Sequence, residues 1–203
     1  MKRKPESGRK QAGFSLIELM IAMVVLVVGM MGIMAMVTTA IASNNRNKMD
    51  TTATALSQMV TETVAAQSIV TGTPMDVRDC NPASAGGPQT FRIATLGTPA
   101  NNPDGSAGAS LNANGNIDFT QTYAAVPGGT WPTPSYKMRF VSCGSGGRQA
   151  TYEVRWNVRN ISAFSKLITV SSRLSRQTAA GGAPGEQLKY FATPVTLRTI
   201  AGF

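Results

Sequence analysis

Residues 14–37 read FSLIELMIAMVVLVVGMMGIMAMV, and this stretch decides how the chain begins its fold. Between Leu19 and Val37 it carries no charged side chain and no strong hydrogen-bonding one. As a helix that rises about 1.5 Å per residue, it spans roughly 28 Å, close to the ~30 Å hydrocarbon core of a bilayer. A core helix of a soluble protein would show a polar stripe, and this segment shows none. The sequence therefore predicts a membrane-spanning helix.

Basic residues are concentrated ahead of that helix. The chain has a formal net charge of +9, and residues 1–13 supply +4 of it through Lys2, Arg3, Lys4, Arg9 and Lys10 against Glu6. Cytoplasmic flanks of membrane helices are enriched in Lys and Arg, so we expect residues 1–13 in the cytoplasm and the bulk of the chain outside. Because the excess is partly local, the total charge does not by itself indicate nucleic-acid binding.

Glu18 stands at the start of the apolar run, where an ionisable side chain is costly. A carboxylate at the centre of a membrane helix costs about 2.5–3.5 kcal/mol, and such residues are commonly functional. A secretory signal peptide is one interpretation, since Ala40-Ile41-Ala42 offers an A-x-A cleavage site, but its apolar region is normally only about 7–15 residues long. A plain signal anchor is a second interpretation, and it leaves Glu18 unexplained.

A third interpretation explains Gly13, Phe14 and Glu18 together. The segment GFSLIELMIAMVVLVVG, residues 13–29, resembles the cleavage and methylation segment of type IV prepilins and type II secretion pseudopilins. The resemblance implies that prepilin peptidase cuts between Gly13 and Phe14 and that Phe14 becomes the N-methylated first residue. It also implies that Glu18 pairs with the terminal amine of a neighbouring subunit during assembly.

Elementary electrostatics agrees with that implied role for Glu18. Phe14 and Glu18 are four residues apart, so on a helix they lie on one face about 6 Å apart. Cleavage would create an ammonium group at Phe14, and an ammonium beside a carboxylate lowers the cost of burying either.

The helix is predicted to continue beyond the membrane. Apolar residues recur every three or four positions, at Met49, Ala53, Leu56, Val60 and Val64. This amphipathic stripe is expected to pack on a sheet, and Thr71-Gly72-Thr73-Pro74 is expected to end the helix.

Alternating patterns predict strands in the C-terminal part. The clearest is TYEVRWNVR, residues 151–159, in which Tyr, Val and Trp alternate with Glu, Arg and Asn. The segments YKMRFVSC, KLITVSSRL and KYFATPVTLRTI continue the pattern, and Pro194 suggests an edge position or a bulge. Three or four antiparallel strands with one polar face would accept the amphipathic helix on the other face.

The elements and the resemblance together predict an α+β, pilin-like fold, in which a long N-terminal helix packs on a small antiparallel sheet. We expect a leader at 1–13 that prepilin peptidase removes, a transmembrane or filament-core helix at 14–42, an amphipathic helix at 43–72, and a periplasmic globular head at 73–203. Within the head, residues 81–135 have the composition of loops, apart from one short strand, FRIATL, and residues 136–203 supply the sheet.

The chain contains no histidine and only two cysteines, Cys80 and Cys143. The commonest general base and the usual zinc ligand are therefore missing, and two cysteines alone are too few for a zinc site. Outside the cytoplasm we expect the two cysteines to form a disulfide, which chain-entropy arguments value at about 4 kcal/mol for such a loop. A reactive thiol is the alternative. We expect no catalytic residue, no cofactor and no metal site.

Two surface features have competing interpretations. Asp104, Ser106 and Asp118 suggest a calcium loop, but the acidic spacing of an EF-hand is missing, so a plain surface loop is favoured. The strand arginines suggest a basic patch for DNA uptake, but no tryptophans are interleaved with them as a stacking platform requires. A solvated strand face is therefore favoured, and nucleic-acid binding is not expected; the arginines concerned are Arg155, Arg159, Arg173, Arg176 and Arg198.

The function predicted from the resemblance is that of a minor type IV pilin, a structural subunit in pilus assembly and not an enzyme, and the chain is most similar to PilV-type minor pilins. The alternatives are a minor pseudopilin of type II secretion, or a pilin-like adhesin or DNA-uptake subunit. The implied partners are prepilin peptidase, other major and minor pilins, and the inner-membrane assembly platform. The implied location is the inner membrane, with the head in the periplasm, and then the filament at the cell surface.

Overall fold

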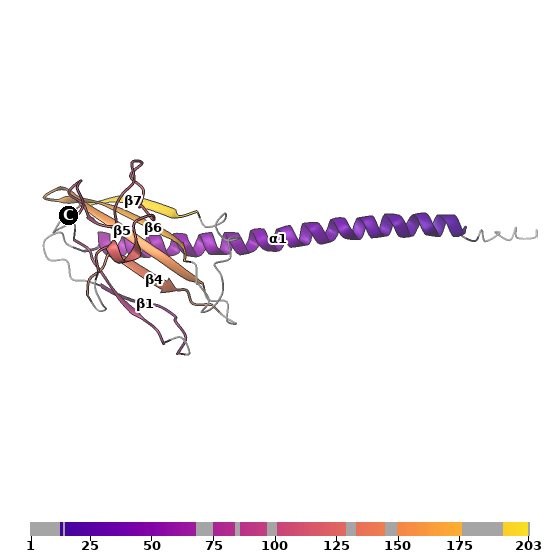
Figure 1. The fold of residues 1–203 in the computed structure, drawn as a ribbon, viewed down its shortest axis with the longest axis horizontal. Coiled ribbons are helices and arrows are strands. Elements are labelled where there is room, and N and C mark those ends of the chain that lie inside the picture. The colour runs from indigo at the N-terminus through magenta and orange to yellow at the C-terminus, as the bar shows by residue number, and fades with distance from the viewer. Residues whose placement is uncertain are drawn as a thin grey trace, which may run out of the picture. The chain divides into compact units, whose positions relative to one another are not determined.

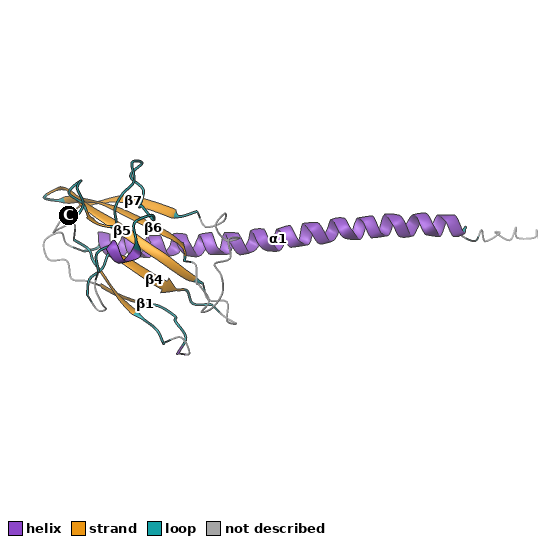
Figure 2. Cartoon of the chain, in the orientation of Figure 1, coloured by secondary structure: helices purple, strands orange, loops and turns teal. Residues whose placement is uncertain are grey.

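The computed structural model describes residues 13, 15–67, 75–83, 86–96, 101–128, 133–144, 150–175 and 193–202. The chain divides into two compact units, residues 1–45 and 46–203. A single helix, α1 (Leu16–Ala65), contributes to both units (Figure 1). The second unit, which we call the head unit, adds β1 (Met75–Arg78), β2 (Thr90–Ile93), β3 (Ala107–Gly108), the short 3-10 helix η2 (Tyr123–Ala125), β4 (Lys137–Val141), β5 (Thr151–Ser162), β6 (Ser165–Leu174) and β7 (Val195–Gly202) (Figure 2).

The larger sheet is antiparallel and is built around β5. Its strands follow the order β3-β5-β6-β7, and β4 also pairs with β5. β4 lies along the first half of β5, with Met138 opposite Val154, while β3 lies along the second half, with Gly108 opposite Asn157. The two short strands therefore share one edge of β5. β1 and β2 form a separate two-stranded sheet.

The hydrophobic core lies between one face of the larger sheet and the second half of α1. Val60 and Val64 of the helix belong to the same buried cluster as Val154, Trp156 and Ile168 of the sheet, and all five are completely buried. The four-residue spacing between Val60 and Val64 is part of the amphipathic repeat that the sequence predicted for this helix. The predicted α+β arrangement, a long N-terminal helix packed with a small antiparallel sheet, is confirmed.

Buried hydroxyl groups fix the position of α1 on the sheet. The Ser172 hydroxyl donates to the carbonyl of Ala53 over 2.6 Å, and the Ser57 hydroxyl donates to Ser172 over 2.9 Å. Apolar packing alone would allow the helix to slide, whereas a buried hydroxyl that lost its partner would cost about 1–3 kcal/mol.

A lysine of the sheet caps the C-terminal end of α1. The helix ends at Ala65, and the Lys166 ammonium donates to the carbonyl of Gln67 over 2.7 Å. The last carbonyls of a helix lack internal partners and carry partial negative charge, so a cation there is stabilising. The sequence placed the end of this helix at residue 72; the residues at 68–72 lie outside the described part of the chain.

The strand pattern predicted the centre of the sheet and missed its periphery. The β5–β6 hairpin is present, and Pro194 directly precedes β7, which lies at an edge of the sheet. The predicted strand FRIATL is shorter than expected, since β2 ends at Ile93. The strands β1 and β3 were not predicted, because each is too short to show a period.

The expectation of a solvated polar face on the sheet is wrong for the central part of β5, although Arg159 and Arg198 are exposed as expected. Glu153, Arg155 and Asn157 alternate with the core residues of β5 as predicted, but they are only 6%, 2% and 1% exposed. Residues 101–128, which we call the covering loop, pack over this face. From Tyr152 to Val158, β5 is therefore buried on both sides, with an apolar core on one and a polar layer on the other.

We expect the apolar core to be the main source of stability of the head unit. Ile168→Ala, at a fully buried position, should lower the free energy of unfolding by about 2–5 kcal/mol. Ile200→Ala is the matched control, because that side chain is 66% exposed, and it should change the value by less than about 0.5 kcal/mol. Denaturant unfolding of the full chain in nonionic detergent, followed by tryptophan fluorescence, measures both. Equal effects of the two variants would contradict this description of the core.

Candidate functional site

The N-terminal end of α1 begins directly after the predicted cleavage position. The Ser15 hydroxyl accepts a hydrogen bond from the backbone N–H of Glu18 over 3.3 Å, and the Ser15 carbonyl accepts one from Leu19 over 3.2 Å. Ser15 is therefore the N-cap of the helix, and Ser15 and Glu18 have the spacing of a capping box. Gly13 is exposed ahead of the cap, and Phe14 lies outside the described residues.

Glu18 lies in the first turn of α1 and is exposed. It makes no ion pair with another described residue, so no carboxylate–cation pair within residues 15–67 accounts for it. Its backbone N–H is held by Ser15, and its carboxylate is available to an outside cation. The sequence did not predict the cap, although the Ser-x-x-Glu spacing is its usual signature.

The first unit presents an apolar surface without cover. The large apolar side chains from Leu16 to Val37 are between 50% and 79% exposed. In the described part of the chain, α1 is the one helix that is long and apolar enough to cross a membrane. An apolar surface of this size is found where lipid or neighbouring helices cover it.

The two cysteines lie together in the head unit. Cys80 and Cys143 are joined as a disulfide, with their Cα atoms 5.1 Å apart, and the bridge connects the segment after β1 to the segment after β4. The neighbouring Asp79 is buried, and its carboxylate accepts the backbone N–H groups of Gln89, over 2.6 Å, and Asn81, over 3.2 Å. The bridge is thus set in a segment that has its own hydrogen bonds.

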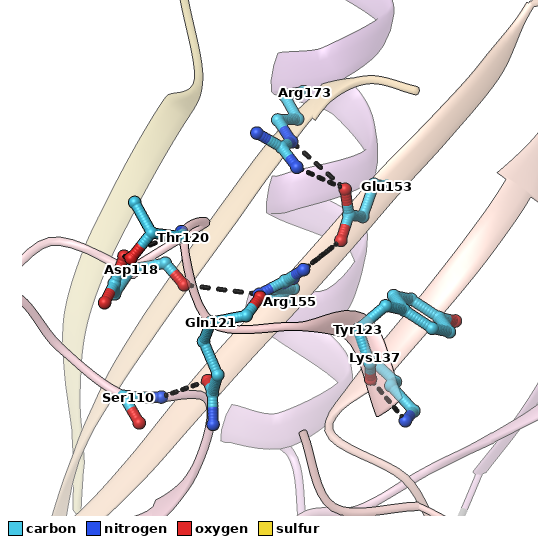
Figure 3. Close-up of polar contacts among 9 residues, drawn as sticks. All are labelled: Ser110, Asp118, Thr120, Gln121, Tyr123, Lys137, Glu153, Arg155 and Arg173. Carbon is cyan, nitrogen blue, oxygen red and sulfur yellow. Dashed lines mark hydrogen bonds and ion pairs between the residues drawn. The ribbon is translucent and has the colours of Figure 1, made fainter. Parts of the chain in front are cut away.

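A cluster of charged side chains fills the polar face of the sheet (Figure 3). Glu153 is at its centre: one carboxylate oxygen accepts from the Arg155 guanidinium, over 2.7 Å at Nε, and the other accepts from Arg173, over 2.8 Å at Nη2. Buried ion pairs are stable only when their remaining donors are also bonded, and Arg155 meets this condition. It donates to the backbone carbonyls of Asp118, over 3.2 Å, and Gln121, over 2.8 Å.

Two aromatic rings of the covering loop lie among these cations. The Arg173 guanidinium is 4.2 Å from the centre of the Phe119 ring, and the Arg155 guanidinium is 5.1 Å from it. The Tyr123 ring lies 4.4 Å from the Arg139 guanidinium and 4.6 Å from the Lys137 ammonium. These distances are within the range of cation–π attraction.

The covering loop is held to the sheet by side chains that reach its backbone. Lys137 donates to the carbonyl of Tyr123 over 2.6 Å, and the Asn157 amide donates to the carbonyl of Ala109 over 2.9 Å. Gly108, where β3 joins β5, has a φ of 106°, and a side chain there would overlap the Trp156 carbonyl. A small apolar cluster within the loop, Ala109, Ile117 and Val126, completes the attachment.

The positive charge of the cluster affects its titratable groups. Burial lowers the pKa of Lys137, and the nearby Arg155 and Arg139 lower it further. Burial raises the pKa of Tyr123 to about 12; Arg139 and Arg155 act to lower this pKa, and Glu153 acts to raise it. Burial is the main cause of both shifts.

The residues considered for a calcium loop have other partners. One oxygen of Asp104 accepts the Ser106 hydroxyl over 2.6 Å, and one oxygen of Asp118 accepts the Thr120 hydroxyl over 2.7 Å. These bonds lower the pKa of each carboxylate, which is the pattern of a local turn. No cluster of three metal-ligating side chains occurs among the described residues. The segment is not a plain surface loop, however, since Ser106 is completely buried.

The predicted arginine patch is divided between different environments. Arg155 and Arg173 join the cluster, Arg198 donates to the Asn114 carbonyl over 3.0 Å, and Arg159 is exposed; Arg176 lies outside the described residues. The sequence did not predict that the charged cluster also contains Phe119, Tyr123, Lys137 and Glu153. The available signal was a lone glutamate between basic residues on a strand, together with aromatic residues in a segment of loop composition.

The profile of the prokaryotic N-terminal methylation motif matches residues 8–34. This range contains Gly13, Phe14 and Glu18 and includes the first turns of α1. The match indicates a type IV pilin-like or pseudopilin protein, and the motif implies processing by prepilin peptidase and assembly with other pilins in the membrane. No curated protein and no solved structure matches the chain.

We expect Glu153 to be essential to the polar layer. Glu153→Gln keeps the shape of the side chain but leaves Arg155 buried without a counter-charge, which should lower the free energy of unfolding by about 3–5 kcal/mol. Asp76→Asn is the control: it removes the exposed pair with Arg92, and no measurable change is expected. Denaturant titration of the full chain in detergent compares them. A Glu153→Gln variant as stable as the control would contradict this role.

Proposed function

We propose that the chain is a minor pilin of a type IV pilus, a structural subunit of pilus assembly. The observation that carries this proposal is the methylation motif at residues 8–34, which coincides with a helix that begins at Leu16, just after the cleavage position. A pilin-type motif fits a structural protein and not an enzyme. The length of the chain, its glycines at 29 and 32, and the strand YEVRWNV favour the PilV-type minor pilins among the relatives that the motif allows.

In this proposal the chain has four parts with different fates. Residues 1–13 are a leader that prepilin peptidase removes in the cytoplasm. Residues 14–42 anchor the subunit in the inner membrane and later lie in the filament core, where neighbouring helices replace lipid around the apolar surface. Residues 43–72 attach this segment to the head, and residues 73–203 form the head in the periplasm. The disulfide Cys80–Cys143 fits that oxidising compartment.

Glu18 has a defined role in the same proposal. Its carboxylate has no ion-pair partner among the described residues, and cleavage would supply a cation at Phe14 of the neighbouring subunit. Pairing the two would lower the cost of bringing either charge into the apolar core of a filament. The Ser15 cap supports the processing step, because a helix that starts at Leu16 leaves the bond between Gly13 and Phe14 outside the regular helix.

Mass spectrometry of sheared surface filaments tests the proposed function. We expect a peptide that starts at Phe14 and carries an N-methyl group, in substoichiometric amount relative to a major pilin. A mature terminus at Ser43 would overturn the proposal in favour of a secretory signal peptide. A correctly processed Phe14 terminus that stays in the envelope fraction, in cells that shed filaments, would favour a pseudopilin of type II secretion.

Glu18→Ala separates processing from assembly. The variant should still be cleaved and methylated, because Gly13 and Phe14 are intact, but it should be depleted from filaments by at least about tenfold if the charge pair contributes 1.4 kcal/mol or more. Glu18→Gln tests whether charge or hydrogen bonding is needed, and Glu62→Ala is a control for the loss of a carboxylate elsewhere on α1. Immunoblots of sheared filaments and of whole cells provide the ratio. Normal incorporation of Glu18→Ala would refute this role.

A further inference from the structure

The charged cluster on the polar face of the sheet contains more cations than its own carboxylates neutralise. Lys137, Arg139, Arg155 and Arg173 surround Glu153, and the cross-strand register explains their proximity. Arg139 and Arg173 lie directly opposite Glu153 on its two neighbouring strands. Lys137 lies directly opposite Arg155, a like-charge pair that is unfavourable between adjacent strands.

The covering loop bonds these cations without neutralising them. It offers backbone carbonyls to Lys137 and Arg155, and the rings of Phe119 and Tyr123 to the guanidinium groups. Carbonyls and rings satisfy donors but carry no net charge. The nearest carboxylate of the loop, Asp118, is bound to Thr120. Even with Asp118 counted, four cations face two carboxylates, so the surface above the cluster is electropositive.

Two of the cations remain accessible to a partner. Arg139 is exposed and makes no ion pair with a described residue, and the Arg173 side chain is 34% exposed. They stand on either side of the strand that carries Glu153, so their Cα atoms are about 10 Å apart by the spacing of neighbouring strands. Both guanidinium groups are held in place by a ring, which reduces the entropy lost when a ligand binds.

The chemistry of the cluster favours carboxylates as ligands. Glu153 already accepts hydrogen bonds from two guanidinium groups of this cluster, those of Arg155 and Arg173. Acidic side chains at alternating positions of an extended peptide are about 7 Å apart, which is comparable to the separation of the two arginines. Nucleic acid is disfavoured, because the rings of Phe119 and Tyr123 are already in contact with cations and are not free for base stacking.

We propose that Arg139 and Arg173, held by Tyr123 and Phe119 on either side of Glu153, form a docking site for an acidic peptide segment of a partner protein. Lys137 and Arg155 lie beneath and supply the positive potential, while the exposed arginines make the contacts. The site belongs to the head unit, and it requires neither the cleavage at Gly13 nor the assembly role of Glu18. A failure of this proposal and a failure of the proposed function are therefore distinguishable.

Binding of a fluorescein-labelled poly-glutamate peptide to the full chain in nonionic detergent tests the proposal. We expect saturable binding at low ionic strength that poly-glutamine of the same length does not compete for and that added salt weakens. Arg139→Gln and Arg173→Gln should each weaken binding by at least about fivefold, as expected for the loss of one well-ordered charge pair. Arg46→Gln is the matched control, because Arg46 belongs to the helix on the opposite face of the sheet, and it should leave binding unchanged.

The outcomes separate a specific site from general charge. Arg173 also binds Glu153, so Arg173→Gln can lower stability. Among the described residues Arg139 contacts only the Tyr123 ring through its guanidinium, so its variant should unfold like the parent protein. The proposal is overturned if no saturable binding occurs or if Arg46→Gln weakens binding as much as Arg139→Gln does. It is also overturned if a single-stranded oligonucleotide binds more tightly than poly-glutamate and depends on the same arginines, since nucleic acid would then be the ligand.

Discussion

The structure of the head unit depends on one constraint: from Tyr152 to Val158, β5 is buried on both faces, although its sequence alternates between apolar and polar residues. An alternating strand normally places its polar side in water. Here the apolar side packs against α1, and the charged side is enclosed by the covering loop. Every charged group on that side then needs a partner, and the requirement determines much of the surrounding structure. Glu153 links β5 to β6 through Arg173, while Arg155 binds the loop backbone.

This constraint also explains where the sequence was informative and where it was not. The helix, the central hairpin and the core face follow from local periodicity, and Val60, Val154 and Trp156 occupy the predicted side. The fate of the opposite face depends on contacts more than thirty residues apart in the chain, such as that between Arg155 and Gln121. The Asn- and Gly-rich composition of the loop gave no indication of those contacts. Asn and Gly favour turns whether the turn lies in solvent or packs on a sheet.

Scattered apolar residues in the loop were the signal that the sequence analysis missed. Ile117, Val126 and Phe119 are spread through a segment of Asn, Gly and Ser, and each packs in or against a small cluster of its own. A long segment without regular structure inside a compact domain is usually either functional or anchored by such side chains. At the N-terminal site, by contrast, the sequence was more informative than the structure. A short motif there predicted the site, and the structure added the Ser15 cap and the position at which α1 begins.

The start of α1 also gives a reason why a carboxylate is needed so close to the proposed cut. The N-terminal end of a helix carries partial positive charge, and cleavage before Phe14 would add a full ammonium charge beside it. Two positive charges would then enter an apolar filament core together. Glu18, in the first turn, interacts favourably with the helix end within its own chain. In the proposed assembly it would also offer an anion to an amine of a neighbour. In the proposed filament a neutral residue at this position would leave both positive charges unbalanced, and this electrostatic gain offsets part of the cost of a carboxylate in the apolar run.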